Sequence, residues 1–313
     1  MKVKVFIDGS SGTTGLRIAD RLAERPEIEL LSISAEGRKD VHERAKVINS
    51  ADLAFLCLPD AASKEVMPLL RPDVKVLDTS TAFRTDAAWD YGFPELKGQK
   101  AKIQNSYRVA VPGCYASGFI SIARPLVELG LVPQSYPFSC TGISGYSGGG
   151  KKMIAEYESA DRPAHSKLDA PKSYGLGLAH KHLPEMQKIS GLAHTPMFVP
   201  VVCDYYCGMQ VLVPLDLTLA GSTAEQVAEG IAAYYKDAAT VKVHALNEAL
   251  PENGLYSNAM AGTDRMELYM TVNAAGDQMM LVSLFDNLGK GSSGAAVQCM
   301  NLMLGLEETK GLE

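Results

Sequence analysis

Residues 1–80 alternate short apolar runs with segments of helical periodicity, and this alternation restricts the possible folds more than any other feature of the chain. Continuous apolar runs joined by helices are typical of a parallel sheet that is covered on both faces. The predicted strands are residues 2–8, 28–34, 51–59 and 74–80. We therefore predict an α/β protein whose first part is a Rossmann-type parallel sheet.

The middle of the chain follows a different pattern. Strand-like runs at 137–144, 197–217 and in "MELYMTVNA" and "MMLVSLFDN" have few helices between them. This predicts an α+β domain with a mixed, largely antiparallel sheet. Between Thr79 and Val109 the periodicity disappears, and we expect a long loop of the kind that is often functional. The glycine-rich stretch 142–152 is expected to form a flexible backbone that accepts anions.

Charge and composition exclude several classes of function. The net charge is −6 and no basic block is present, which argues against nucleic acid or an anionic membrane as partner. No apolar run reaches the about 18 residues of a membrane span. Most of the six cysteines lie far apart, and Cys203 and Cys207, spaced C-x-x-x-C, lack a second Cys/His pair at zinc spacing, so we expect neither a disulfide framework nor a metal. The chain starts directly on a strand-like run without room for a cleavable signal, and we expect a cytoplasmic protein.

A glycine motif, "DGSSGTTG", joins the first strand to the first helix. Glycines at such a turn let the backbone approach a pyrophosphate, whose charge then lies at the helix N-terminus. A plain strand-to-helix turn is the alternative, but the strand–turn–helix context favours a dinucleotide. The candidate cofactor-binding residues of this motif are Gly9, Ser11, Gly12, Thr13, Thr14 and Gly15.

The end of the second strand bears on the choice of cofactor. Ser34 is its last residue and Arg38 follows it, and hydroxyls with cations suit the 2′-phosphate of NADP(H). Glu36 keeps NAD possible, because NAD sites place a carboxylate at this point to hold the ribose. Arg38 as a solvated loop charge is the other interpretation. We predict NADP(H).

One cysteine, Cys114, stands between a Pro-Gly turn and the first turn of a predicted helix. The unpaired N–H groups and the positive dipole end of a helix lower the pKa of a thiol placed there. The N–H groups near Tyr115 and Ala116 are also candidate donors to an oxyanion. A buried packing cysteine is the alternative, but we interpret Cys114 as a nucleophile.

The stretch "AHKHLPEMQ" supplies candidates for proton transfer. Histidine titrates near neutrality, and His182 lies three residues before Glu185, so the carboxylate can orient the imidazole on a helix. The sequence leaves open whether His180 or His182 faces the thiol, and we favour His182 because of Glu185. Arg84, after the fourth predicted strand, is either a ligand for phosphate or carboxylate or a surface arginine.

Six motifs together resemble the N-acetyl-γ-glutamyl-phosphate reductases in their shorter form. They are "GSSGTTG", "STAFR…YGFPE", "VPGCYASG", "SGYSGGGKK", "HKHLPE" and "DNLGKGSSGAAVQCMN", in family order from Gly9 to Asn301. The resemblance implies NADPH-dependent reduction of an acyl phosphate to N-acetylglutamate semialdehyde and phosphate through a thioester. It further implies Cys114 as nucleophile, His182 as acid/base, Ser80 and Arg84 near the substrate, and Ser144, Gly145 and Asn287 near the cofactor.

The domain organisation follows from the same resemblance. Residues 1–113, completed by a C-terminal helix within 288–313, are expected to bind NADP, and residues 114–287 to carry catalysis and oligomerisation. The protomers are expected to form a homodimer or homotetramer through the sheet of the second domain. Two other functions stay open: an aspartate-semialdehyde dehydrogenase-like reductase of another acyl phosphate, and a non-catalytic NADP-binding redox sensor.

Overall fold

The computed structural model describes residues 2–313, with the side chain of Glu252 left aside, and divides into two compact units. Unit 1 is Met1–Gly113 with Ser292–Leu312, and unit 2 is Cys114–Gly291 with Glu313. The chain therefore passes between the units at 113/114 and again at 291/292. The boundaries predicted from the sequence lie at 113/114 and 287/288.

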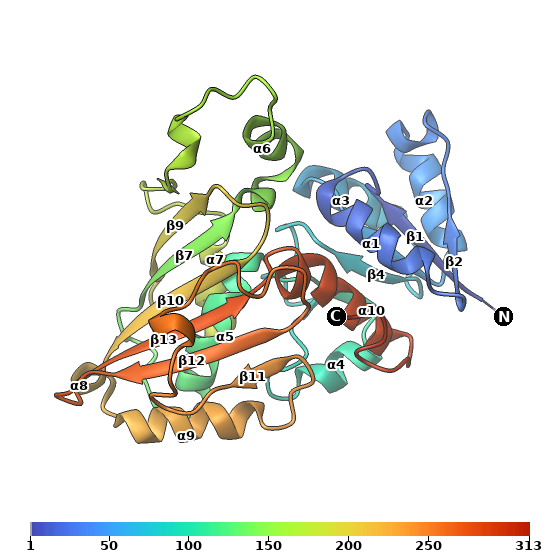
Figure 1. Ribbon diagram of the computed structural model, residues 1–313. Coiled ribbons are helices and arrows are strands. Elements are labelled where there is room, and N and C mark those ends of the chain that lie inside the picture. The colour runs from blue at the N-terminus through green and yellow to red at the C-terminus, as the bar shows by residue number, and fades with distance from the viewer. Residues whose placement is uncertain (1) are drawn as a thin grey trace. The chain divides into compact units, whose positions relative to one another are not determined.

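Unit 1 is built on a six-stranded sheet in which all pairings are parallel. The strand order is β2-β1-β3-β4-β6-β5. Figure 1 labels β1, β2 and β4 of this sheet. The strands are β1 (Val3–Asp8), β2 (Ile28–Leu31), β3 (Leu53–Leu56), β4 (Lys75–Asp78), β5 (Asp90–Tyr91) and β6 (Arg108–Ala110). This confirms the predicted parallel sheet.

Successive residues of a strand point to opposite faces of the sheet, so the apolar strands of unit 1 present side chains on both faces. Helices cover each of these faces. Val5 and Ile7 join one apolar cluster with α1 (Thr13–Ala23), α4 (Gln99–Asn105) and α10 (Gly294–Met303). Phe6 between them joins a second cluster with α2 (Val41–Ser50) and α3 (Asp60–Val66). Two short helices, η1 (Gly37–Lys39) and η2 (Met67–Leu69), complete the unit's connections.

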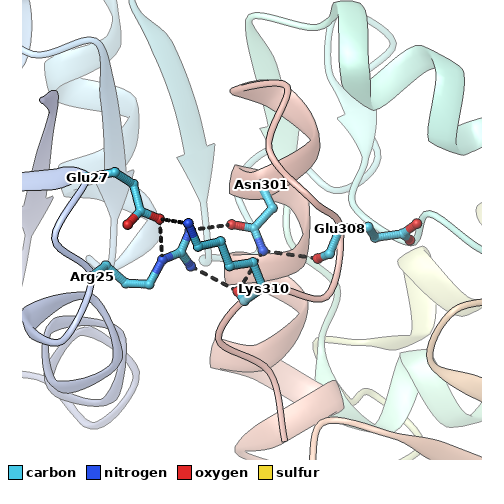
Figure 2. Close-up of polar contacts among 5 residues, drawn as sticks. All are labelled: Arg25, Glu27, Asn301, Glu308 and Lys310. Atoms are coloured by element: carbon cyan, nitrogen blue, oxygen red, sulfur yellow. Dashed lines mark hydrogen bonds and ion pairs between the residues drawn. The ribbon is translucent and has the colours of Figure 1, made fainter. Parts of the chain in front are cut away.

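Polar contacts hold the C-terminal segment in unit 1 (Figure 2). The guanidinium of Arg25 donates to Lys310 O at 2.9 Å and to Asn301 Oδ1 at 3.2 Å, and its Nε lies 2.7 Å from Glu27 Oε1. Asn301 Nδ2 in turn donates to the main-chain oxygens of Glu308 and Lys310 at 3.0 and 2.9 Å. The segment after α10 is therefore tied to the turn before β2.

Unit 2 contains a seven-stranded mixed sheet in the order β11-β12-β13-β10-β7-β9-β8. Only β7–β9 and β11–β12 among these neighbours are parallel, and the other four pairs are antiparallel. This confirms the predicted sheet type. The strands are β7 (Ser139–Gly145), β8 (Lys172–Ser173), β9 (Met197–Cys203), β10 (Met209–Asp216), β11 (Val241–Val243), β12 (Met266–Val272) and β13 (Gln278–Phe285).

The central helix of unit 2 is α5 (Cys114–Glu128), which packs on β10 and β13 and contacts α7 (Leu183–Ser190) and α9 (Ala224–Tyr235). Eleven of its fifteen residues are buried, which suits a helix enclosed by a sheet and other helices. The remaining helical elements are η3 (Tyr146–Gly149), α6 (Gly150–Tyr157), η4 (Lys167–Asp169), α8 (Leu217–Ala220), η5 (Pro251–Asn253) and the π-helix η6 (Gly289–Ser293).

One local expectation is wrong. The expected loop between Thr79 and Val109 contains β5, α4 and the start of β6, and these pieces are too short for a periodic pattern to show. The glycine-rich stretch 142–152 begins within β7, where the strand 137–144 was predicted, and continues through η3 into α6. Among the residues described, no helix is long and apolar enough to cross a bilayer.

Candidate active site

The glycine motif forms a tight turn between β1 and α1. Gly9 has φ +87°, and a Cβ built on it would lie 2.3 Å from Cys57 O, so only glycine fits. Gly12 is the N-cap of α1, and with no side chain to bond them the first N–H groups of the helix remain for an anion. Thr13 begins the helix, and Gly15 is buried in its first turn. Thr14 Oγ1 lies 3.1 Å from Ser292 Oγ.

A cavity of about 380 Å³ adjoins this turn, between the ends of β1 and β2. Gly9, Ser11 and Arg38 are among its lining residues, as is Ser32. Ser34 is used locally instead, because its Oγ accepts the N–H of Gly37 at 3.0 Å. A cavity beside a helix N-terminus with an arginine in its wall has the chemistry to hold a phosphorylated adenosine.

A buried ion pair below the turn was not anticipated from the sequence. Arg44 Nε lies 2.8 Å from Asp8 Oδ2, and both side chains are at most 7% exposed. Burial raises the pKa of the Asp8 carboxyl above its usual range, and the Arg44 hydrogen bond opposes that rise. Asp8 directly precedes Gly9, so its position in the motif was the available signal. The pair fixes the last residue of β1, which also lines the cavity.

Ser80 and Arg84, the two candidate substrate-binding residues, both donate hydrogen bonds to other residues of unit 1. Arg84 is buried and donates through Nε to Val111 O and through Nη2 to Thr79 O, both at 2.9 Å. Ser80 Oγ donates to Asp78 Oδ1 at 2.5 Å. These contacts tie the segment after β4 to the strand end that precedes Pro112 and Gly113. Contact of Ser80 and Arg84 with the substrate stays a prediction.

Cys114 is the first residue of α5 and is half-buried. The π-helix η6 lies against it, since a Cβ built on Gly291 would be 3.0 Å from Cys114 Cβ. Burial raises the pKa of the Cys57 thiol to about 12 and raises the pKa of the Cys140 thiol still further. Cys114 differs from these two thiols in standing at the start of a helix, and its role as the nucleophile stays a prediction.

Both candidate histidines lie next to the residue that follows the cysteine. The Tyr115 ring is centred 5.8 Å from the His180 ring and 6.1 Å from the His182 ring. His180 and His182 meet edge to face at 4.7 Å, and the main-chain N–H of His182 donates to His180 Nδ1 at 3.2 Å. Burial, with a smaller effect of Lys181, lowers the pKa of His180 to about 4. Unit 2 therefore brings His180 and His182 together at the ring of Tyr115, the residue that follows Cys114.

Tyr174 belongs to this cluster and escaped the sequence analysis. Its hydroxyl donates to the Tyr115 hydroxyl at 3.3 Å, and its ring meets His180 at 5.9 Å. Burial, opposed by the Tyr115 hydrogen bond, raises the pKa of Tyr174 to about 12. A lone tyrosine six residues before a histidine carries no periodic or motif signal, so only the structure identifies it.

The remaining candidates also lie in unit 2. Glu185 is buried in the first turn of α7, three residues after His182. Asn287 links two segments, because its Oδ1 accepts the N–H of Gly208 and its Nδ2 donates to Ser147 Oγ, both at 2.9 Å. Ser144 and Gly145 end β7, and Ser144 Oγ donates to Gly145 O at 3.1 Å. Within the described part of the chain, no group of three metal-ligating side chains is placed to hold an ion.

Two protein-family models match the chain. The model described as "Semialdehyde dehydrogenase, NAD binding domain" matches residues 4–104. The model described as "Semialdehyde dehydrogenase, dimerisation domain" matches residues 114–287.

Curated relatives match over nearly the whole chain. A protein of Trichormus variabilis named N-acetyl-gamma-glutamyl-phosphate reductase is 46% identical over 320 residues and covers 99% of both chains. One of Burkholderia cenocepacia with the same name is 46% identical over 305 residues, covering 96% of this chain and 97% of its own.

Solved structures share the fold at low identity. Aspartate semialdehyde dehydrogenase II of Vibrio cholerae has a TM-score of 0.68 at 18% identity, covering 97% of this chain and 99% of its own. The Francisella tularensis aspartate semialdehyde dehydrogenase has a TM-score of 0.70 at 16% identity, covering 96% and 100%.

Proposed function

The chain belongs to the N-acetyl-γ-glutamyl-phosphate reductases of the semialdehyde dehydrogenase family, and we propose that it catalyses the reaction those relatives are named for. That reaction is the NADPH-dependent reduction of N-acetyl-γ-glutamyl phosphate to N-acetylglutamate 5-semialdehyde and phosphate, a step of arginine biosynthesis. The observation that carries the proposal is the placement of Cys114 at the start of α5 with His182 at the start of α7, both beside Tyr115.

In the first half of the reaction the Cys114 thiolate attacks the acyl-phosphate carbonyl. The C–S bond forms, the C–O bond to phosphate breaks, and inorganic phosphate leaves a thioester behind. His182 takes up the thiol proton before this attack and returns it to the sulfur once the thiolate is regenerated. Main-chain N–H groups at the start of α5 are proposed to stabilise the oxyanion before phosphate departs, because the positive end of the helix dipole lies there.

In the second half the thioester carbon is reduced. NADPH, when bound, supplies the hydride. The resulting oxyanion on the Cys114 adduct is again stabilised at the start of α5, and it collapses by breaking the C–S bond, which releases the aldehyde and regenerates the thiolate. Glu185, three residues after His182 on α7, is proposed to orient the imidazole in both halves.

We propose that unit 1 holds NADP(H) rather than NAD(H). The glycine turn, the uncapped start of α1 and the Arg38 side chain in the cavity wall support this, because a guanidinium suits a 2′-phosphate. We also propose that the protein acts in the cytoplasm as a homodimer or homotetramer joined through the sheet of unit 2. The matching model's description as a dimerisation domain and six free cysteines are in line with that proposal.

The reverse reaction provides the test. Purified protein is supplied with NADP⁺, phosphate and either N-acetylglutamate semialdehyde or aspartate semialdehyde, and NADPH formation is followed by absorbance. We expect phosphate-dependent reduction with the acetylated substrate only. Turnover of aspartate semialdehyde alone would transfer the assignment to the related reductases, and NADP⁺ binding without turnover of either substrate would favour a redox sensor.

A further inference from the structure

We propose that His180 is a positioning residue: its Nδ1 atom holds the main-chain N–H of His182 and so fixes where the catalytic imidazole stands at the start of α7. The inference deepens the proposed function and rests on it for the role of His182. It divides the tasks within "HKH", because one histidine carries the proton and the other sets the position of the first.

The hydrogen bonds at the start of α7 centre on His180. Its side-chain Nδ1 accepts from the N–H of His182 at 3.2 Å, and its main-chain oxygen accepts from the N–H of Leu183 at 3.0 Å. The cap residue His182 itself supplies no side-chain hydrogen bond to the helix. Two of the N–H groups that a helix start leaves unpaired are thus satisfied by one residue outside the helix. His182 cannot rotate about its main chain without breaking the first of these bonds.

The acceptor role determines the tautomer of His180. A ring nitrogen that accepts a hydrogen bond carries no proton, so the single proton of a neutral His180 is on Nε2. Protonation of Nδ1 would set two N–H groups against each other and release His182. Positioning therefore requires that His180 stay neutral while the enzyme works.

The surroundings of His180 keep it neutral. Its ring is met edge-on by Tyr115 at 5.8 Å, by Tyr174 at 5.9 Å and by Phe198 at 5.2 Å. Burial among these rings, with the charge of Lys181 as the second cause, lowers its pKa to about 4.

The other ionisable groups close to His180 do not raise its lowered pKa again. The neighbouring hydroxyls of Tyr115 and Tyr174 have raised pKa values because of burial, so both stay uncharged at neutral pH. Among the residues described, Cys114, whose charge would raise the pKa of both tyrosines, and His182 also face the cluster. A proton carrier works best with a pKa near the operating pH, and His180 is far from it.

Three variants separate positioning from proton transfer. In His180→Asn the amide oxygen takes the place of Nδ1 as acceptor, whereas His180→Leu removes the acceptor and keeps the bulk. We expect His180→Asn to keep kcat within about threefold and the wild-type pH profile, and His180→Leu to lose about 10- to 100-fold in kcat with little change in KM, as misplaced catalytic groups do. His182→Asn should lose the pH-dependent limb of the kcat profile altogether. His194→Asn is the matched control, because His194 is an exposed histidine.

Nitrogen NMR of the histidine rings tests the same inference without any turnover. In the wild-type protein the His180 signals should show a proton on Nε2 and no titration between about pH 5.5 and 8. Titration of His180 near neutrality, a proton on Nδ1, or equal loss of kcat in His180→Asn and His180→Leu would each overturn the inference. If the wild-type protein reduces NADP⁺ with neither semialdehyde, the proposed function fails, and the tautomer still decides whether His180 holds His182.

Discussion

Substitution of Gly291 by alanine tests whether the position of the Cys114 thiol is set by the π-helix behind it. The new Cβ would lie 3.0 Å from Cys114 Cβ, 3.1 Å from Asp286 O and 3.1 Å from Phe285 Cε2. Carbon atoms in contact are usually about 3.5–4.0 Å apart, so the two carbon neighbours, on Cys114 and Phe285, are about 0.5 Å too close. Something on one of the three sides has to move.

The structure indicates which neighbour moves. Asp286 O accepts the N–H of Gly291 at 2.9 Å and is fixed by that bond, and Phe285 is fully buried. Cys114 is half-buried and begins its helix, so it is the neighbour with room. Since a displacement of about 1 Å can cost about 100-fold in rate, a shift of about 0.5 Å should cost about tenfold in kcat. Overpacking should also cost about 1 kcal/mol of unfolding free energy.

Steady-state kinetics and thiol alkylation provide the measurement. We expect kcat to fall about tenfold, KM for NADP⁺ to stay within about twofold, and the pH dependence of iodoacetamide labelling of Cys114 to shift, because the thiol leaves its place at the start of α5. Gly254→Ala is the matched control, since Gly254 has extended backbone and no atom within 4 Å of its would-be Cβ. A Gly291→Ala enzyme with wild-type kcat and labelling, or an equal loss in Gly254→Ala, refutes the reasoning.

Three further predictions concern other parts of the molecule. Cys114→Ala should abolish turnover while NADPH binding, followed by fluorescence titration, stays nearly intact, and normal turnover of this variant would remove Cys114 from the mechanism. Arg38→Ala should raise KM for NADP⁺ about tenfold and leave KM for NAD⁺ almost unchanged, since only NADP⁺ carries the 2′-phosphate; an equal rise for both would place Arg38 elsewhere. Hydrogen bonding by Lys310, with Arg25 contributing, lowers the pKa of Glu27 from 4.5 to about 2 (Figure 2). Because the folded-state pKa is the lower one, the contribution is complete above about pH 4.5 and is lost as the pH falls towards about 2. Glu27→Gln should therefore lower the free energy of unfolding by about 1 kcal/mol at pH 7, which is measured as a lower Tm than that of the wild type. The difference in Tm should shrink on acidification, and a difference that is independent of pH would contradict this prediction.

Hydrophobic patterns in the sequence predicted the longer helices and the buried strands correctly. The apolar runs of β1, β3 and β4 and the helices α1, α5 and α10 were predicted, because burial on both faces or on one face imposes a period that a single segment displays. β6 and α4 were missed, since three and seven residues are too few to display one.

The candidate site divides in the same manner. Cys114, His180 and His182 could be named from residue type and motif, and the glycine turn from its strand–turn–helix context. The separate roles of the two histidines could not be predicted from the sequence. They depend on a hydrogen bond from the His182 main chain and on the rings of Tyr174 and Phe198, which lie in other segments. The buried contacts of Arg84 with Thr79 and Val111 were equally invisible to spacing.

The sequence by itself determined the fold class, the glycine turn and the cysteine at a helix start, because each follows from backbone preferences and apolar periodicity within a few neighbouring residues. Only the tertiary structure decided that Gly291 backs Cys114, that Tyr174 joins the histidines and that His180 is neutral. These properties arise from segments far apart in the chain, whose packing sets the contacts, the burial and therefore the protonation of each side chain.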